Sequence, residues 1–322
     1  MLNRRACLGL LAAPTLVRAA LAQPAFPNRP VRIVIGFPPG GGIDIVARLM
    51  APKLAERFGQ PFVVENRPGA NGLIATQAVA QSEPDGHSML FGTTGNFAVN
   101  PVLYANPGFD IERDLAPLTQ VASLPFLLMI NPSVPAQSFP ELIALAKARP
   151  GALNFCSSGN GGLPHLSGEL MNMLAGTRIS HVPYRGSAPA LNDLIAGQVQ
   201  ILFDVLAIGQ PHIESGRVRA LATTGPTRME LFGGLPPTAE TVPGFEVVNA
   251  YGMLVRAGTP AAIVQRLQAE IAGVMTLPDI RERFAALGVE AVGSTPEAFG
   301  AFIRSETMKW GRVIRSAGVR PE

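Results

Sequence analysis

Residues 31–59 read VRIVIGFPPGGGIDIVARLMAPKLAERFG, and this stretch decides the fold class. The β-rich run from Val31 to Phe37 predicts a strand, which two prolines and three glycines then end. Apolar residues follow at helical spacing as far as Gly59, namely Ile43, Val46, Ala47, Met50 and Leu54. The stretch is therefore predicted to be a strand, a tight turn and a helix, the unit from which parallel sheets are built.

The same alternation continues along most of the chain. Further strands are predicted at 62–65, 88–91, 126–130, 153–155, 179–182, 199–203 and 218–222, with helices between them. The C-terminal part is mostly helical, over 260–275, 279–287 and 296 to about 316. This order is typical of the α/β class, and the length favours two domains. Because no linker separates them, strands are expected to cross between two lobes, and the C-terminal helices to return to the first lobe.

The N-terminus has the pattern of an export signal. Arg4 and Arg5 precede an uncharged stretch over 6–17, and residues 20–22 are the small residues typical of a cleavage site. The apolar stretch is shorter than the roughly 20 residues that span a bilayer, which argues against a membrane anchor. Cleavage is predicted after Ala22, and the arginine pair leaves both general and twin-arginine export open.

Removal of residues 1–22 changes the charge balance, because they carry three arginines and no acidic residue. The remaining chain has 23 basic and 23 acidic residues, so the pI of 9.2 for the whole chain does not indicate a nucleic-acid partner. Cys156 is then the only cysteine, which excludes an intrachain disulfide. No nucleic acid is expected as a partner, and stability must come from the core.

Four strand-to-helix junctions are candidate ligand-binding turns, at 37–44, 92–96, 157–162 and 184–187. Glycine lets the backbone approach a ligand, and the N–H groups at a helix start are unpaired donors with a partial positive charge. In open α/β sheets, ligands bind at the carboxyl ends of strands, where these turns fall. Glycine also makes ordinary helix caps, but such caps need one glycine and not three. Together the turns favour an anion site.

Side chains at these turns each allow two interpretations. Asp44 could cap the helix that it begins, or could orient donors and water around an anion. His165 could donate to a ligand or cap its own helix. Arg185 could pair with a carboxylate or remain solvated. Asp204, at the end of a predicted strand, could accept from a ligand amine or hydroxyl or cap the next helix.

Nucleotide-binding and nucleophile motifs are absent. The turn at Gly40 and Gly42 lacks the third glycine of Gly-x-Gly-x-x-Gly, since Ile45 stands there, and no phosphate loop of the Gly-x4-Gly-Lys-Ser/Thr type is present. Ser157 and Ser158 lie in no Gly-x-Ser-x-Gly elbow. These motifs give no support for a nucleotide cofactor or a serine enzyme.

Cysteine and metal chemistry have equally little support. Cys156 could be a nucleophile with His165 or His181 and Asp204, but a lone cysteine at the end of a strand is more often a core residue. The four histidines show no metal-ligand spacing. The chain is therefore expected to have no catalytic residue, metal or cofactor.

Five motifs occur in order from about residue 27 to the end: VRIVIGFPPGGGID (31–44), VVENRPG (63–69), PDG (84–86), HVPYRGSAPALNDLIAGQVQILFD (181–204) and AGTP (257–260). Together they resemble the Bug family of extracytoplasmic solute receptors, which serve tripartite tricarboxylate transporters. The resemblance implies a type II periplasmic-binding-protein fold, with two Rossmann-like lobes and a ligand cleft between them. Lobe 1 is expected to comprise residues 23–122 and 250–322, and lobe 2 residues 123–249.

The resemblance also implies the site and the partners. In that family the pocket is lined by the four turns, and a carboxylate is held largely by backbone N–H groups and bridging waters. On this chain it points to Phe37, Gly41, Asp44, Thr93, Thr94, Asn96, Ser157, Ser158, Gly159, His165, Tyr184, Arg185 and Asp204. The expected partners are a small carboxylate (a di- or tricarboxylate, an amino acid or an aromatic acid) and the membrane permease subunits. The protein is expected to be a periplasmic monomer.

Three positions depart from the family pattern. Ile43 replaces a common threonine, Gly162 stands where serine is frequent, and Ala250 stands where an aromatic residue often occurs. These changes remove side chains near the cleft, so the sequence leaves the ligand open. It also leaves open whether the closed form serves a transporter or a sensor kinase.

Overall fold

The computed structural model describes residues 26–321, so the predicted signal peptide, residues 1–22, lies outside the described part. The strands form one continuous path in the order β2-β1-β3-β9-β4-β7-β5-β6, with β8 and β10 also paired to β4. Their bounds are β1 Val31–Ile35, β2 Phe62–Asn66, β3 Ser88–Thr93, β4 Leu115–Ile130, β5 Asn154–Ser157, β6 Ser180–Pro183, β7 Ile201–Val205, β8 Arg219–Thr223, β9 Val248–Arg256 and β10 Glu290–Ala291.

Helices cover this sheet along its length. They are α1 Gly42–Phe58, α2 Leu73–Ala80, α3 Asn100–Leu103, α4 Ile111–Asp114, α5 Phe139–Ala148, α6 Leu163–Ala175, α7 Ser187–Ile195, α8 Leu206–Glu214, α9 Ala261–Met275, α10 Pro278–Ala286 and α11 Pro296–Ala317. None of the helices within residues 26–321 is both long enough and apolar enough to cross a membrane.

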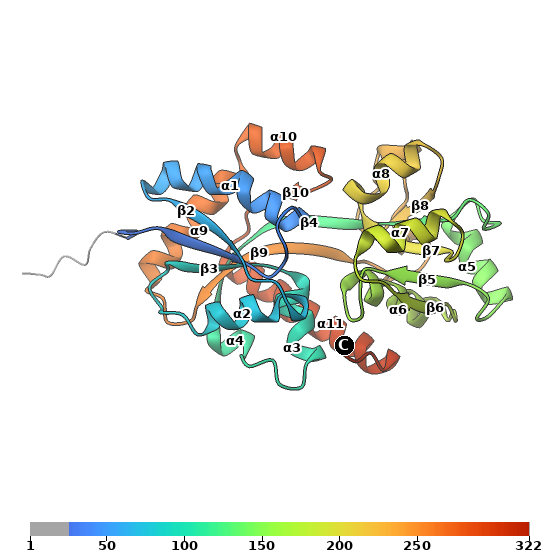
Figure 1. The fold of residues 1–322 in the computed structure, drawn as a ribbon, viewed down its shortest axis with the longest axis horizontal. Helices are drawn as coiled ribbons and strands as arrows, with labels where there is room; N and C mark the ends of the chain where they lie inside the picture. The colour runs from blue at the N-terminus through green and yellow to red at the C-terminus, as the bar shows by residue number, and fades with distance from the viewer. Residues whose placement is uncertain (1–25, 322) are drawn as a thin grey trace, which may run out of the picture.

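Two α/β bodies lie side by side (Figure 1). The first holds β1, β2 and β3 with α1, α2, α9 and α10, and the second holds β5 to β8 with α5 to α8. In each body neighbouring strands are parallel, as in β1 with β2 and β3, and β5 with β6 and β7. Parallel strands need helical crossovers, which is why strand and helix patterns alternate in the sequence.

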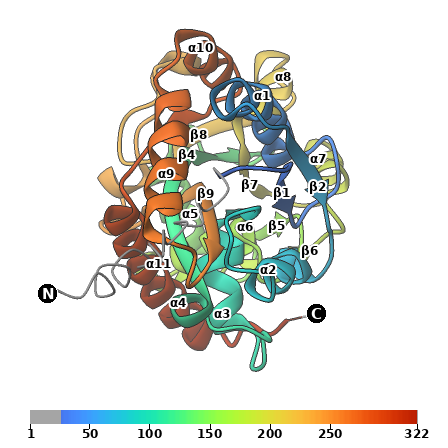
Figure 2. The same ribbon diagram turned by 90° about the vertical axis from the view of Figure 1, so that its left-hand side faces the viewer.

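Strand β1 shows how the first body buries its core. Val31, Ile33 and Ile35 pack in one apolar cluster with α1, α9 and α10, whereas Val34 joins another cluster with α2 and α11. In Figure 2, α1 and α10 lie on one side of this sheet and α2 and α11 on the other. A strand covered on both faces carries a nearly continuous apolar run, as VRIVI does.

Strands β4 and β9 join the two bodies. Residues 115–125 of β4 pair antiparallel with β9, and residues 126–130 pair with β7 of the second body. The sequence predicted only 126–130 as a strand. The rest of β4 was not predicted because it contains Pro117 and Pro125, and proline is disfavoured inside a sheet. The pairing with β9 shifts register just after Pro117.

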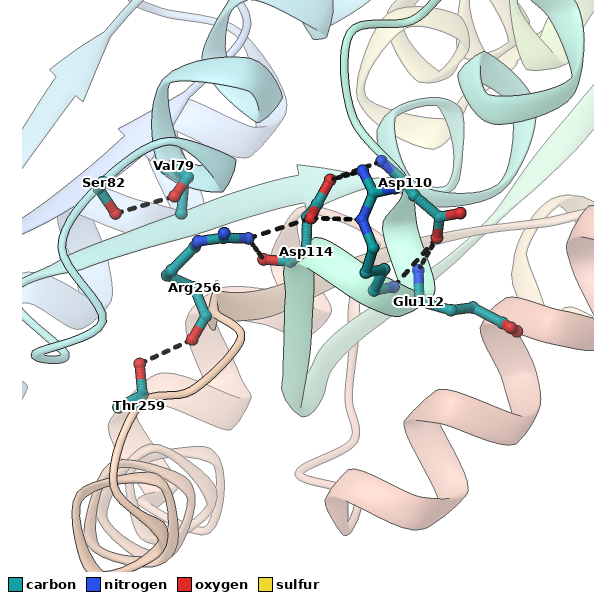
Figure 3. A network of polar contacts seen from close by, with 8 residues as sticks. Val79, Ser82, Asp110, Glu112, Asp114, Arg256 and Thr259 are labelled. Atoms are coloured by element: carbon teal, nitrogen blue, oxygen red, sulfur yellow. Dashed lines mark hydrogen bonds and ion pairs between the residues drawn. The ribbon is translucent and has the colours of Figure 1, made fainter.

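Polar contacts anchor the outer ends of these crossing strands (Figure 3). Arg256, the last residue of β9, donates through Nη1 to the carbonyl of Asp114 at 2.8 Å and to its Oδ1 at 3.3 Å. Arg113 forms two hydrogen bonds with the same carboxylate and holds the pKa of Asp114 well below its ordinary value. Asp110 accepts from the Glu112 and Arg113 amides and so caps α4. The start of β4 is thereby fixed to the end of β9.

Candidate ligand-binding site

A cavity of about 810 Å³ lies between the two bodies. The first body lines it with the turn after β1, the turn before α2 and residues after β3. The second body lines it with the turns after β5 and β6 and the end of β7. Each of these segments lies at or after the carboxyl end of a strand, the turn before α2 following β2, so the sheet topology brings them to one place.

Four helices begin at this cavity, and none has a side-chain cap. Their N-cap residues, which all line the cavity, are Gly41 of α1, Gly162 of α6, Gly186 of α7 and Val205 of α8. The first-turn N–H groups of a helix have no partner within the helix, and here no side-chain oxygen takes their place. The cavity therefore has hydrogen-bond donors and positive helix ends on both sides.

The missing caps follow from the residue type at each N-cap, because neither glycine nor valine has a side-chain oxygen. Elsewhere the chain does cap helices, with Ser138 on α5 and Thr295 on α11. Helices α9 and α10 also lack a side-chain cap, so this feature alone does not mark the cavity. What distinguishes the site is that four uncapped N-termini converge on one cavity, a ready-made arrangement for binding an anion.

Among residues 26–321, Asp204 is the only charged residue that lines the cavity, and no lysine, arginine or histidine does so. It is 5% exposed. Its Oδ1 accepts from the Val205 amide at 2.8 Å, and its Oδ2 is buried with no hydrogen-bond partner among the described residues. Burial raises the pKa of Asp204 to about 6; the Ser187 hydroxyl opposes this shift, although it forms no hydrogen bond with Oδ2 in the structure. Because no cationic side chain lines the cavity among the described residues, a bound anion must rely on main-chain amides and neutral side-chain donors.

Six of the thirteen predicted site residues line the cavity: Phe37, Gly41, Thr93, Ser158, Gly159 and Asp204. They come from four of the strand ends and turns described above, and from both bodies. The structure thus brings them together around one space. Ligand contact by any of the thirteen stays a prediction.

Three of the others, all in the first body, support the turns without lining the cavity. Asp44 accepts from the Gly40 amide and from Arg48, both at 2.9 Å, and Arg48 lowers its pKa to about 2. It therefore does not occupy the N-cap position of α1, which belongs to Gly41; it lies in the first turn and reaches back to Gly40. Asn96 accepts from the Thr93 amide at 2.8 Å, and Thr94 Oγ1 accepts from the Ala250 amide at 2.9 Å.

In the second body, Ser157 and His165 hold the turn after β5. Ser157 Oγ lies 2.7 Å from His181 Nε2, and His165 Nδ1 accepts from the Gly161 amide at 3.0 Å. The two imidazoles stack, with ring centroids 3.6 Å apart. Burial, and to a smaller extent His165, lowers the pKa of His181 to about 3. The His181 imidazole is therefore uncharged at neutral pH.

The remaining two predicted residues lie beside the turn after β6. Tyr184 donates its hydroxyl to Asp193 at 2.6 Å, and Arg185 is exposed. Neither lines the cavity.

The arrangement required for a cysteine enzyme is not formed. Cys156 is fully buried, and its Sγ donates to the carbonyls of Ala190 and Ile201. Burial raises the pKa of this thiol to about 12. Of its two candidate partners, His181 pairs with Ser157 and His165 accepts from the Gly161 amide instead. Within residues 26–321, no three His, Cys, Asp or Glu side chains are grouped so that they could hold a metal ion.

Sequence reasoning missed several lining residues. Ala70 and Asn71 belong to a turn in which both adopt positive φ, 46° and 51°. The signal that could have found them is the pair of flanking glycines, Gly69 and Gly72. Asn249 and Tyr251 reach the cavity from β9, and no sequence pattern indicated this because β9 itself was not predicted as a strand.

This fold and this cavity define a two-lobed α/β binding protein. The family described as tripartite tricarboxylate transporter family receptor matches residues 46–319. The chain belongs to this family.

Individual relatives agree with the assignment. A UPF0065 protein from the tcbD-tcbE intergenic region of a Pseudomonas species is 37% identical over 97% of this chain and 94% of its own length. BugT of Bordetella pertussis is 34% identical over 98% and 97%. The predicted resemblance to the Bug family is confirmed.

Solved structures confirm the fold. A protein of R. palustris in complex with adipate is 36% identical with a TM-score of 0.81, covering 92% of this chain and all of that one. The periplasmic binding protein BugD is 33% identical with a TM-score of 0.77 over 92% and 100%. MatC of Rhodopseudomonas palustris with bound malate is 29% identical with a TM-score of 0.77 over 90% and 100%. The family is one of solute receptors, so the chain is a binding protein and not an enzyme.

Proposed function

We propose that this receptor captures a small carboxylate in the cavity between its two bodies and delivers it to membrane permease subunits. The observation that carries the proposal is the convergence of four uncapped helix N-termini on a cavity without a cationic side chain. Such N-termini stabilise negative charge through their amides and dipoles. Relatives that hold adipate and malate support the choice of a carboxylate.

Binding is proposed to draw two lobes together, residues 23–122 with 250–322 and residues 123–249. The donors on α1 belong to the first lobe, and those on α6, α7 and α8 belong to the second. One anion that contacts both sets favours the closed arrangement, because the open one cannot offer it both. The closed monomer would then be the form that docks on the permease.

The site of action is proposed to be the periplasm. The N-terminal sequence supports export with cleavage after Ala22. Relatives described as a periplasmic transporter and a periplasmic binding protein agree with this location.

Substitution at an N-cap tests the proposal directly. Gly162 has φ −70° and ψ 159°, which an N-cap aspartate adopts readily, and an added Cβ would meet only ordinary contacts at 3.6 and 3.7 Å. In Gly162→Asp the new carboxylate should accept from the first-turn amides of α6 and so occupy the anion site. We expect unchanged or slightly higher stability but at least about tenfold weaker carboxylate binding, since roughly 1.4 kcal/mol lost from binding is tenfold in Kd.

Gly162→Ala is the matched control, because it adds a Cβ without an oxygen. Calorimetry with C4 to C6 dicarboxylates and aromatic acids should show binding by the wild type and by Gly162→Ala, and loss in Gly162→Asp. Equal affinity in all three proteins, or no binding by the wild type, would contradict the proposed site.

A further inference from the structure

Two residues that line the cavity each have a hydrogen-bond acceptor with no partner among the described residues. The acceptors are Asp204 Oδ2 and Asn249 Oδ1, both buried, and both residues line the cavity. The other buried unpartnered side-chain atoms of the described residues belong to His87 and His212, which do not line it. An unsatisfied buried acceptor is costly, so two of them in one cavity call for an explanation.

The sheet places these two acceptors on either side of one strand. Asp204 in β7 pairs with Leu127 of β4, and Asn249 in β9 pairs with Leu124 of β4. Phe126 of β4 lines the cavity between these positions. The acceptors therefore form part of one wall, where the strands that join the two bodies meet.

Within residues 26–321, no protein group donates a hydrogen bond to either acceptor. No lysine or arginine of the described residues lines the cavity, and the Ser187 hydroxyl, which also lines it, forms no hydrogen bond with Asp204 Oδ2. A ligand that is only an anion would bring further negative charge towards Asp204. A ligand that also carries an N–H or O–H group would satisfy the acceptors while its carboxylate binds the helix N-termini.

We propose that the ligand is a carboxylate that bears its own hydrogen-bond donor, a hydroxyl or an ammonium group, which Asp204 and Asn249 accept. This inference rests on the proposed function, since it presupposes that a carboxylate binds in this cavity. It narrows the ligand class to hydroxy acids and amino acids, and it predicts that plain dicarboxylates bind more weakly.

Matched sets of acids test the inference by calorimetry with the purified protein. Each set has a plain parent, its 2-hydroxy form and its 2-amino form: succinate, malate and aspartate; glutarate, 2-hydroxyglutarate and glutamate; phenylacetate, mandelate and phenylglycine. The aromatic set is included because Phe37, Tyr104, Phe126 and Tyr251 line the cavity. In the set that binds best, the hydroxy or amino form should bind at least about tenfold more tightly than its parent.

Asp204→Asn should remove this preference. The donor-bearing acids are expected to lose at least about tenfold in affinity, because a neutral amide accepts a hydrogen bond less strongly than a carboxylate, whereas the plain parent should bind as well as before or better. A misfolded variant would bind both kinds of acid more weakly, so affinities that change in opposite directions exclude misfolding as the cause. Glu214→Gln, which removes one exposed negative charge from α8, is the control and should change neither.

A second comparison separates the two donors. Affinity for the amino form should fall as the pH drops below about 6, where Asp204 becomes protonated. Affinity for the hydroxy form should change less. If plain and donor-bearing acids bind equally, or if Asp204→Asn weakens both alike, the inference is wrong while carboxylate capture stands. If none of the acids binds, the proposed function falls with it.

Discussion

Replacing Asp204 with asparagine should stabilise the ligand-free protein at neutral pH. Folding buries this carboxyl in the cavity wall and raises its pKa from 3.8 to about 6. In the unfolded chain the group is ionised above about pH 4, whereas the native state keeps its proton until about pH 6. The unfolded state thus binds fewer protons in this window, and the stability of the wild type falls as the pH rises through it.

The size of the effect follows from the shift. A change from 3.8 to about 6 corresponds to about 3 kcal/mol at 1.36 kcal/mol per pKa unit. The favourable contribution is complete below pH 3.8 and is lost above about 6. Asp204→Asn has no such titration, but its amide is still incompletely bonded, so we expect a gain of about 1 to 3 kcal/mol at pH 7.5 and almost none at pH 4.

Urea unfolding across this pH range measures the difference. The protein should first be unfolded and refolded without solute, because a bound ligand would raise the stability of the wild type. Glu214→Gln controls for the change in net charge. A variant that is as stable as the wild type at pH 7.5, or less stable, would show that Asp204 is not an uncompensated buried carboxyl.

Three further predictions concern groups around the site. Native Cys156 should not react with Ellman's reagent at pH 8, because burial raises the pKa of its thiol, and Cys156→Ser should bind ligand as the wild type does. The pKa of His181 is lowered from 6.5 to about 3, so the unfolded wild type binds more protons than the native state in this range and its stability falls as the pH drops below 6.5. His181→Gln lacks this titration, so its free energy of unfolding in urea should fall less on acidification; an equal fall in both proteins would refute this. Gly36→Ala should cost roughly 1–3 kcal/mol and weaken binding, because its Cβ would lie 2.3 Å from Gly72 Cα between two cavity turns; Gly300→Ala, with ordinary contacts at 3.5 Å, is the control in thermal melts and calorimetry.

The sequence predicted most of the parallel strands and long helices, because these elements have strong local signals. The helix predicted at 43–58 is α1, which begins at Gly42, and the helix predicted at 296 to about 316 is α11, which ends at Ala317. Their boundaries follow apolar spacing and terminal glycines. The family motifs added the order of the elements and the two-lobed fold.

The crossing strands were not predicted in full, and the reason is physical. β4 contains Pro117 and Pro125, and β9 contains Gly252, so both resemble loops locally. Their pairing is specified by contacts between distant segments, such as Gly252 with Gly92 and with Gln120. Local propensity carries no information about such partners.

The candidate site was predicted in outline. Glycine-rich turns indicated main-chain donors, and Gly41, Ser158 and Gly159 do line the cavity. Which side chains face the cavity depends on hydrogen bonds that no pattern encodes, as with Tyr184, which turns to Asp193. Asn249 reaches the wall only because β9 lies next to β4.

A crystal structure of the protein with a bound carboxylate is the most direct measurement of the central claim. We expect the carboxylate oxygens to accept hydrogen bonds from first-turn amides of α1 on one side and of α6, α7 or α8 on the other, with no lysine or arginine in contact. A carboxylate held by a basic side chain, or bound away from these helix N-termini, would contradict the account.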